Sequence, residues 1–264
     1  MNLLIDGKNA LVTGGASGIG EDISLHLAQE GVNLVVTSRT IDPINALKKK
    51  IDDYGFNIKV NGIIVDFLDV NWRLNFFSEL SKYKINILVN NAGHNLNVID
   101  PYCSISDWEK VLSLNFLVPV EICNAVIPHM KLNNWGRIVN ITSCAGIENM
   151  GPVTYGVAKS SLTVYTRTMG RILATEGGAV VMTAVFPGVV LTKGGHWDNV
   201  LKTDPGRAKA YLKERCPLGR FGKVDEISPV VVFYCSELAS FSHGAIIPVD
   251  AGQCRSYMSH NYMD

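Results

Sequence analysis

A tyrosine and a lysine stand four residues apart in the run Tyr155-Gly-Val-Ala-Lys159. On a helix, side chains at positions i and i+4 lie one above the other on the same face. An ammonium group held beside a phenol favours the phenolate and lowers the pKa of the tyrosine. A tyrosine tuned in this way can give or take a proton near neutral pH, as general acid–base catalysis requires. Because this spacing also arises by chance on many helices, its meaning depends on the rest of the chain.

A glycine-rich loop lies near the N-terminus, in the run Thr13-Gly-Gly-Ala-Ser-Gly-Ile-Gly20. Its glycines allow a tight turn and a close approach of backbone to a pyrophosphate, and the N-terminus of a following helix supplies N–H donors. The spacing is G-x-x-x-G-x-G rather than G-x-G-x-x-G. Because the loop follows an apolar segment of strand length, it predicts a dinucleotide site. The contacts expected from it are Gly14, Ser17, Gly18, Ile19 and Gly20.

Other polar or small residues follow further apolar runs. Asn90-Asn-Ala-Gly93 closes one run, Ser143 follows another directly, and Pro187-Gly188 follows a third. Asn115 lies on the apolar stripe of a long predicted helix, where a polar side chain needs a buried partner. Taken alone, each of these has a plain structural explanation as a turn, a turn cap or a bend in the chain.

Apolar runs of strand length alternate with segments of helical periodicity along the whole chain. The predicted strands cover residues 10–13, 32–38, 58–65, 86–90, 137–142, 179–186 and 245–249. This alternation indicates right-handed βαβ crossovers and a parallel sheet covered by helices on both faces. We therefore predict an α/β fold, a single doubly wound Rossmann-type domain over residues 1–264 with about seven strands. Ligands of such sheets bind at the carboxyl ends of strands, where the polar segments lie.

The predicted helices include one from about Ser106 and one from near Val153 to about Thr175, with Asp42 and Asp69 as caps of two others.

Composition excludes several classes of protein. Lysine plus arginine and aspartate plus glutamate number 24 each, which argues against nucleic acid as the main partner. The N-terminus lacks the apolar core of a signal peptide, and the longest weakly polar stretch, 177–192, is too short to span a membrane. No cysteine pair has C-x-x-C spacing. We therefore expect free thiols, no metal site and a cytoplasmic protein.

Taken together, these features resemble the short-chain dehydrogenase/reductase family, in the subgroup whose chains are about as long as this one. The match covers the T-G-x-x-x-G-I-G loop, the N-N-A-G segment, Asn115, Ser143, Tyr155, Lys159 and the P-G-x-x-x-T segment that ends at Thr192. The resemblance implies that Tyr155 protonates a carbonyl oxygen as hydride arrives and that Ser143 hydrogen-bonds the same oxygen. It implies that Lys159 binds the nicotinamide ribose hydroxyls and tunes Tyr155, and that Asn115 holds a water in a proton relay to Lys159.

The resemblance also indicates where the rest of the cofactor lies. Asp66, which Phe67 follows, looks like the acid that contacts the adenine, and Thr192 with the backbone near Val190 would contact the carboxamide. Small or bending residues at two further strand ends complete the expected cofactor site: Asn91, Ala92, Gly93, Pro187 and Gly188. Ser143 precedes Tyr155 by twelve residues where thirteen is the commoner spacing in the family, so Thr142 is a rival for the serine's role.

The end of the second strand bears on which cofactor is used. An NAD site usually places an acid there to hold the ribose 2′-hydroxyl. Here Ser38 occupies that position, and Arg39 can pair with a 2′-phosphate. We predict NADP(H) in preference to NAD(H), although Ser17 stands where the family often has a second basic residue.

A segment of about residues 190–215 is predicted to form a mobile lid over the substrate. The candidate substrate contacts are His94, Glu148, Asn149, His196 and Trp197. As a set they are polar, and they predict a small hydroxylated or charged ketone or secondary alcohol, such as a sugar or hydroxy-acid derivative.

Three alternatives and the assembly remain open. A 3-oxoacyl-carrier-protein reductase would call for a basic patch at the pocket mouth, such as Arg167 and Arg171, although these can instead lie in a subunit interface. A non-catalytic NAD(P)-binding regulator would have no need of an acid, and a sugar-nucleotide epimerase or dehydratase would normally show G-x-x-G-x-x-G and a longer C-terminal region. The resemblance implies a homotetramer or homodimer.

Overall fold

Seven parallel strands form one sheet in the order β3-β2-β1-β4-β5-β6-β7. The structure is a computed structural model that describes residues 1–148 and 150–255. Its strands are β1 (Asn9–Val12), β2 (Asn33–Ser38), β3 (Val60–Ile64), β4 (Ile87–Asn90), β5 (Gly136–Ile141), β6 (Val180–Pro187) and β7 (Ile246–Val249). The chain runs outward from β1 to β3 and then crosses back to place β4 beside β1. The strand order therefore reverses between β1 and β4, and the predicted doubly wound parallel sheet is confirmed.

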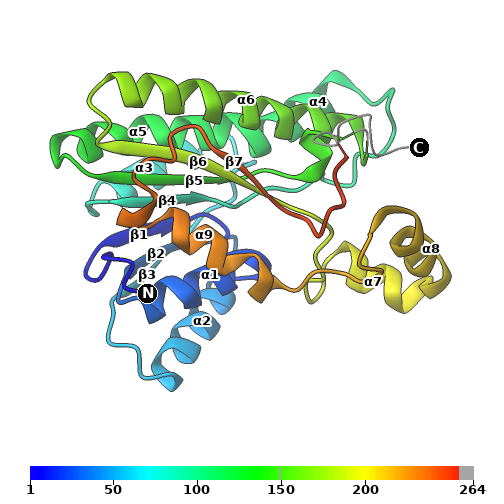
Figure 1. Cartoon of the computed structure of the whole chain (residues 1–264), viewed down its shortest axis with the longest axis horizontal. Coiled ribbons are helices and arrows are strands. Elements are labelled where there is room, and N and C mark those ends of the chain that lie inside the picture. The colour runs from blue at the N-terminus through cyan, green and yellow to red at the C-terminus, as the bar shows by residue number, and fades with distance from the viewer. Residues whose placement is uncertain (149, 256–264) are drawn as a thin grey trace.

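Helices cover both faces of the sheet (Figure 1). On one face lie α1 (Gly18–Gln29), α2 (Ile41–Asp53) and α9 (Ser228–Tyr234). On the other lie α3 (Trp72–Leu80), α4 (Ile105–Leu112), α5 (Val118–Leu132) and α6 (Val153–Thr175). Two further helices, α7 (His196–Thr203) and α8 (Pro205–Arg215), stand beyond the carboxyl ends of the strands, where the predicted lid belongs.

Alternation along the strands divides the core into two clusters. Successive strand residues point to opposite faces, so Val12 and Val36 pack with Ile23 of α1, whereas Leu11 and Val35 pack on the other side. Both faces of the central strands are covered, which is why these strands read as continuous apolar runs.

The two predicted helix caps are wrong by one or two residues. The N-cap of α2 is Thr40, and Asp42 lies inside its first turn. The N-cap of α3 is Asn71, whose backbone N–H donates to Asp69 Oδ1 at 2.7 Å. An acid is favourable anywhere in or just before the first turn, so composition locates a helix start without fixing its cap.

The segment Ile105–Leu132 is continuous helix and, by length and composition alone, is long and apolar enough to cross a membrane. Val111, Val118 and Ile122 of this segment are fully buried against the sheet. Packing in the core therefore accounts for its apolar face. A π-helical turn, Ser113–Leu117, interrupts it midway and holds Asn115.

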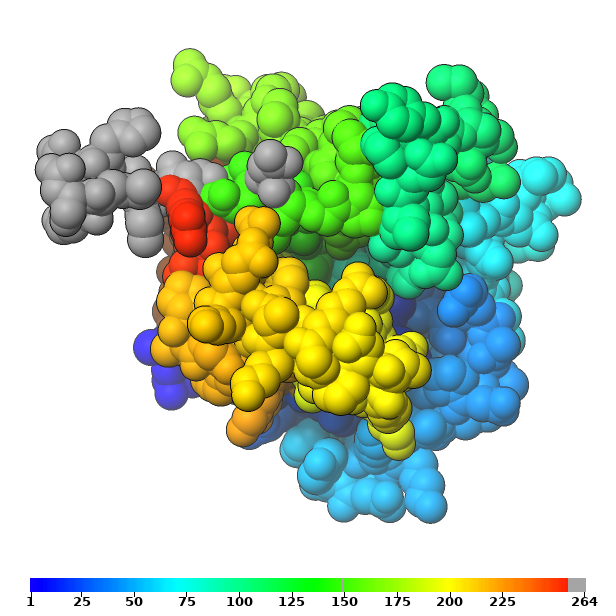
Figure 2. Space-filling view, turned by 90° about the vertical axis from the view of Figure 1, so that its right-hand side faces the viewer, coloured from blue at the N-terminus to red at the C-terminus, as the bar shows by residue number. Residues whose placement is uncertain are grey.

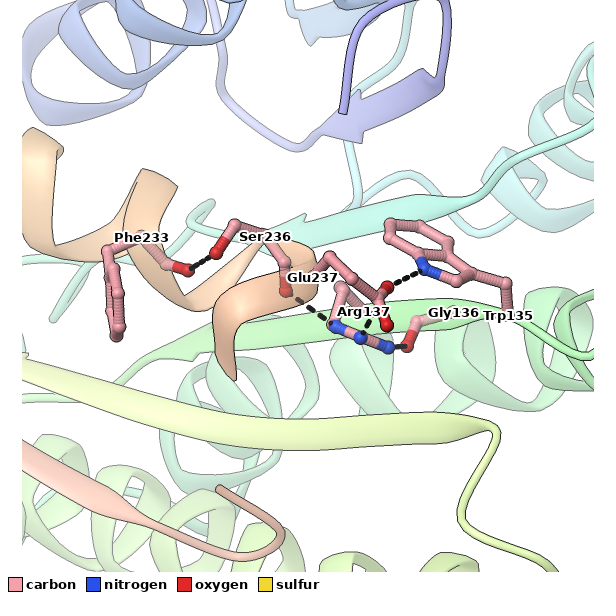
Figure 3. Close-up of polar contacts among 6 residues, drawn as sticks. All are labelled: Trp135, Gly136, Arg137, Phe233, Ser236 and Glu237. Atoms are coloured by element: carbon pink, nitrogen blue, oxygen red, sulfur yellow. Dashed lines mark hydrogen bonds and ion pairs between the residues drawn. The ribbon is translucent and has the colours of Figure 1, made fainter. Parts of the chain in front are cut away.

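A buried arginine anchors the segment after α9 to the amino end of β5 (Figure 3). Arg137 Nε donates to the Ser236 carbonyl at 2.8 Å, and its Nη2 donates to Glu237 Oε2 at 3.0 Å. Its guanidinium lies 4.7 Å from the ring centroid of Trp135, whose indole N–H also donates to Glu237. This cluster lies at the opposite end of the sheet from the candidate site and fixes the chain that leads into β7.

We expect Arg137→Ala to destabilise the protein by about 3 kcal/mol, since it removes several hydrogen bonds and leaves a cavity. Glu237→Gln should cost about 1 kcal/mol or less, because the carboxylate is 43% exposed and the amide oxygen can still accept. Urea unfolding of both variants measures the difference. Equal losses would contradict the assignment of Arg137 as the anchor.

Candidate active site

Helix α6 carries Tyr155 and Lys159 on one face of its first two turns. The Lys159 side chain is buried, and its Nζ donates to the Ile141 carbonyl at 2.8 Å. The same nitrogen lies 5.7 Å from the centroid of the Tyr155 ring. The lysine therefore ties the start of α6 to the end of β5 and keeps the phenol beside that strand end.

The expected effect of the lysine on the phenol is wrong for this structure. Burial raises the pKa of Tyr155 to about 12, and only the hydrogen bond with Ser143 acts in the opposite direction. Burial lowers the pKa of Lys159 to about 8. Desolvation is the largest cause of both shifts, and the amine donates to the Ile141 carbonyl instead of the phenol. At neutral pH Tyr155 therefore keeps its proton, which is the form that a general acid needs.

Ser143, rather than Thr142, accompanies the tyrosine. Ser143 caps the 3-10 turn Cys144–Gly146, and its Oγ accepts from the Ala145 N–H at 3.2 Å while interacting with the Tyr155 phenol. The Thr142 side chain is 3% exposed, and its hydroxyl points at the Val185 carbonyl within the sheet. The shorter spacing between the serine and the tyrosine thus leaves the serine in place.

Asn115 connects the π-turn to the loop after β4. Its Nδ2 donates to the carbonyls of His94 and Val111, both at 2.8 Å, and its Oδ1 accepts from the His94 N–H at 3.1 Å. A Cβ at Gly93 would lie 2.7 Å from Asn115 Oδ1 and 3.0 Å from Lys159 Nζ. Only glycine fits at this position, and the asparagine side chain has no amide hydrogen left for a water.

The glycine loop joins β1 to α1 and is bound to the end of β4. Gly14 and Gly18 have φ angles of +61° and +55°, which favour glycine. A Cβ at Gly20 would lie 2.3 Å from the Gly14 carbonyl oxygen. The N-cap of α1, Ser17, makes no side-chain cap, so the first-turn N–H groups remain available to a ligand. Ile19 is partly buried and packs on the core.

The end of β4 and the segment after β6 complete the surroundings of this loop. Asn91 Nδ2 donates to the Thr13 carbonyl at 2.9 Å, and the N–H groups of Asn91 and Ala92 donate to Thr13 Oγ1. Asn91 thereby holds the loop in place. A Cβ at Gly18 would lie 3.5 Å from Thr192 Cγ2, so the P-G-x-x-x-T segment faces the glycine loop.

At the ends of β2 and β3 the predicted contacts differ in accessibility. Ser38 is the last residue of β2 and is partly buried, whereas Arg39 is exposed and forms no ion pair within the described part of the chain. Asp66 is exposed, and its Oδ1 accepts from the Leu68 N–H at 2.9 Å. Phe67 turns its ring into the core against Trp72, so only its backbone can face a cofactor.

A cavity of about 600 Å³ opens above the carboxyl ends of β4, β5 and β6. Ten predicted residues line it: Gly93, His94, Ser143, Tyr155, Pro187, Gly188, Val190, Thr192, His196 and Trp197. Arg207, Tyr211 and Gln253 line it as well and were not predicted individually. The first two lie in the predicted lid, but nothing in the sequence signals Gln253, which arrives from beyond β7. Figure 2 shows this end of the molecule, with α7 and α8 (yellow) lying across it.

Two of the predicted substrate contacts do not join this cavity in the structure. Glu148 lines a neighbouring groove along α6 instead, and its Oε1 accepts from the Arg255 N–H at 2.7 Å. The turn that ends at Gly146 carries the chain away from Tyr155 before Glu148 is reached. Asn149 lies outside the described residues.

His94 is presented to the cavity as a neutral donor. Its Nδ1 accepts from the Leu96 N–H at 2.8 Å, which leaves Nε2 to carry the proton of a neutral imidazole. Burial, then the charges of Arg39 and His196, lower the pKa of His94. A neutral imidazole N–H can hydrogen-bond an oxygen of a substrate.

The family follows from comparison with known proteins. Residues 8–199 match the family model described as short chain dehydrogenase. This chain is a short-chain dehydrogenase. It is therefore an oxidoreductase, and the resemblance found from its motifs is confirmed.

Relatives and solved structures match over nearly the whole chain. The 3-oxoacyl-[acyl-carrier-protein] reductase of Aquifex aeolicus is 35% identical over 96% of this chain and 99% of its own length. The L-sorbose reductase of Gluconobacter frateurii, solved with NADPH and L-sorbose, is 27% identical with a TM-score of 0.85 and covers 96% of this chain and 98% of its own. A putative 2-deoxy-D-gluconate 3-dehydrogenase of Agrobacterium tumefaciens with bound NADP is 29% identical with a TM-score of 0.84, over 96% of this dehydrogenase and 98% of its own chain.

If Ser143 hydrogen-bonds the reacting oxygen, as the resemblance implies, Ser143→Ala should lower kcat of this dehydrogenase for carbonyl reduction by about 100-fold, since the variant lacks that donor. Thr142→Ala, one residue away, should keep kcat within about threefold, because that side chain faces β6. Steady-state kinetics of the two variants compare the contributions of Ser143 and Thr142 to kcat. A larger loss of kcat in Thr142→Ala than in Ser143→Ala would assign the catalytic hydroxyl to Thr142.

Proposed function

We propose that this chain is an NADP(H)-dependent oxidoreductase that interconverts a small polar ketone and its secondary alcohol. The observation that carries the proposal is the placement of Tyr155, hydrogen-bonded to Ser143 and beside buried Lys159, on the wall of a cavity bordered by Thr192. Thr192 in turn faces the glycine loop. A proton donor and a dinucleotide site thus share one edge of the sheet.

The residues at the switch point between β1 and β4 fit a dinucleotide. The N–H groups at the start of α1 are not capped by Ser17, and the close approach at Gly20 leaves room for backbone alone. Anions bind such helix starts. A bound nicotinamide cofactor supplies hydride to the substrate carbon. Lys159 would donate to the ribose hydroxyls, and glycine at position 93 avoids a Cβ that would lie 3.0 Å from the Lys159 amine.

Proton delivery depends on residues around α6. Tyr155 donates its phenol proton to the substrate oxygen, which Ser143 also hydrogen-bonds. Lys159, buried next to that phenol, is placed to return a proton. Pro119 has no N–H, so the Asn115 carbonyl lacks the donor that an α-helix would provide four residues later. We infer that this carbonyl, rather than the Asn115 side chain, binds the relay water.

The end of β2 supports NADP(H). Arg39 is exposed without an ion-pair partner among the described residues, and the neighbouring Ser38 carries no charge that would repel a phosphate. A guanidinium binds phosphate through two parallel hydrogen bonds. The solved relatives with bound NADPH or NADP agree with this choice.

If Arg39 binds the 2′-phosphate, Arg39→Gln should raise the KM for NADPH by about 10- to 100-fold, the loss of one charge-assisted contact. The KM for NADH should change by less than about threefold, because NADH has no 2′-phosphate. A higher kcat/KM with NADH than with NADPH in the unmodified enzyme would contradict the preference.

The cavity favours an anionic substrate. Among the described residues that line it, none is acidic, whereas Arg207 is cationic and His94 offers a neutral imidazole N–H. Arg207 lies on α8, and its guanidinium forms no ion pair with another described residue. We infer that it binds a carboxylate or phosphate of the substrate, which narrows the class to ketoses or keto acids that carry a negative charge.

On this basis Arg207→Gln should raise the KM for a carboxylated ketose by about tenfold or more and leave kcat nearly unchanged, since the guanidinium binds the ground state and transition state alike. Lys209→Gln is the matched control, because Lys209 lies on the same helix outside the cavity. With a neutral ketose, Arg207→Gln and Lys209→Gln should have the same KM. Equal effects of Arg207→Gln on both substrates would contradict the role.

A 3-oxoacyl-carrier-protein reductase is the second candidate, because a relative of that name is 35% identical to this chain. The basic patch suggested for it does not lie at the mouth. Arg167 and Arg171 follow Tyr155 by twelve and sixteen residues along α6, which places them about 18 and 24 Å along the helix. The lid is basic instead, with six lysine or arginine against three acidic residues between 193 and 215. A panel of acyl-carrier thioesters and acidic ketoses separates the two candidates.

We also propose that the chain assembles as a homodimer or homotetramer. Val157 and Val164 on the outer face of α6 are 43% and 64% exposed and line the groove that holds Glu148. Ile246 and Ile247 of the edge strand β7 are only partly buried. Packing of these surfaces against a second copy would remove them from water.

A further inference from the structure

Two cysteines and an aspartate from distant parts of the chain meet beside the catalytic serine. Cys144 follows Ser143 directly, Asp250 follows β7, and Cys254 comes four residues later. The two sulfur atoms and a carboxylate oxygen all lie within 4.8 Å of one another. The Cys144 sulfur is 3.8 Å from Asp250 Oδ2. The proposed reaction uses none of these three groups.

The segment 250–254 wraps around the carboxylate and directs Cys254 toward Cys144. Asp250 Oδ1 accepts from the Gly252 N–H at 3.0 Å, and Oδ2 accepts from the Cys254 N–H at 2.7 Å. Ala251 and Gly252 have φ angles of +55° and +76°, which turn the chain back. The carboxylate is therefore held in one orientation before any ligand arrives.

The spacing of the three ligand atoms matches a four-coordinate site. Zinc–sulfur bonds of about 2.3 Å and zinc–oxygen bonds of about 2.0–2.2 Å place tetrahedral ligands roughly 3.5–3.8 Å apart. The separations of up to 4.8 Å found here require the atoms to close by roughly 1.0–1.3 Å at most. Rotation about the Cα–Cβ bonds of the two cysteines is the motion that this closure calls for.

The chemistry of the donors selects the kind of ion. Two thiolates and one carboxylate favour a borderline-soft dication over magnesium or calcium, which prefer oxygen ligands. Both cysteines are buried, at 3% and 8% exposure, against Phe186, Met150 and Ile147. Cys144 also lines the catalytic cavity, so an ion can enter from there and a water can occupy the fourth position.

We propose that Cys144, Asp250 and Cys254 bind one divalent cation of the zinc class, with a water from the cavity as fourth ligand. Binding breaks both S–H bonds, releases the two protons to solvent and gives the ion one lone pair from each sulfur, without oxidation. The ion joins the segment after β7 to the turn that holds Ser143. Gln253 of that segment already accepts from the Val189 N–H at 2.9 Å, so the ion would also fix the P-G-x-x-x-T segment.

The test is a titration of the reduced full-length protein with Cd²⁺, whose thiolate complexes absorb in the ultraviolet. One ion per chain is expected to saturate the charge-transfer band, and Zn²⁺ should displace it. Cys144→Ser and Cys254→Ser should each lose at least half of the band, and Asp250→Asn should weaken affinity by about tenfold. Cys103→Ser is the matched control, since Cys103 is the most accessible thiol in the described chain and does not belong to the cluster.

A second measurement needs no variant. X-ray absorption of the zinc-loaded protein should count two sulfur ligands per ion, and zinc should raise the melting temperature as binding to the folded state requires. Zero or four sulfur ligands, a full band in the Cys144→Ser and Cys254→Ser variants, or its loss in Cys103→Ser would overturn the proposal. So would a protein that binds no Cd²⁺ but forms a Cys144–Cys254 disulfide with a mild thiol oxidant, which would make the pair a redox couple instead.

Discussion

The hydrogen bond from the buried Lys159 amine to the Ile141 carbonyl is the contact on which the site depends. Burial removes the charged amine from water, which disfavours its protonated form and lowers the pKa of Lys159. The same hydrogen bond fixes the first turns of α6 against the end of β5. Ser143 lies two residues beyond Ile141 and Tyr155 one helical turn before Lys159, so a single contact sets the position of both.

The parallel sheet supplies the other half of the arrangement. Because β4, β5 and β6 end at the same edge, their loops deliver Gly93, Ser143 and Thr192 to one cavity. Asn115 extends the constraint by binding the loop after β4 from within the π-turn. The lid adds Arg207 and His196 to the wall of this cavity, so two parts of the site that are distant in sequence, the strand ends and the lid, face one another there.

Motifs with local geometry could be predicted from the sequence. The glycine loop, the Tyr155–Lys159 pair and the alternation of strands and helices each depend on neighbours in the chain, and the structure places them as expected. Properties that depend on distant neighbours could not be predicted. The pKa of Tyr155 is governed by burial, Glu148 turns away with a short helical turn, and Gln253 reaches the cavity from beyond β7. The cluster of Cys144, Asp250 and Cys254 could not be predicted for the same reason, because the spacing of these residues in the sequence matches no metal-binding motif.

The central claim is that the Tyr155 phenol, protonated at neutral pH, is the acid of this site. It is tested most directly by Tyr155→Phe, with carbonyl reduction and NADPH binding measured on the same preparation. The account predicts that turnover falls by at least about 100-fold while the dissociation constant for NADPH stays within about threefold, because the phenyl ring fills the same space and only the hydroxyl is lost. Turnover that survives the substitution would show that another group donates the proton.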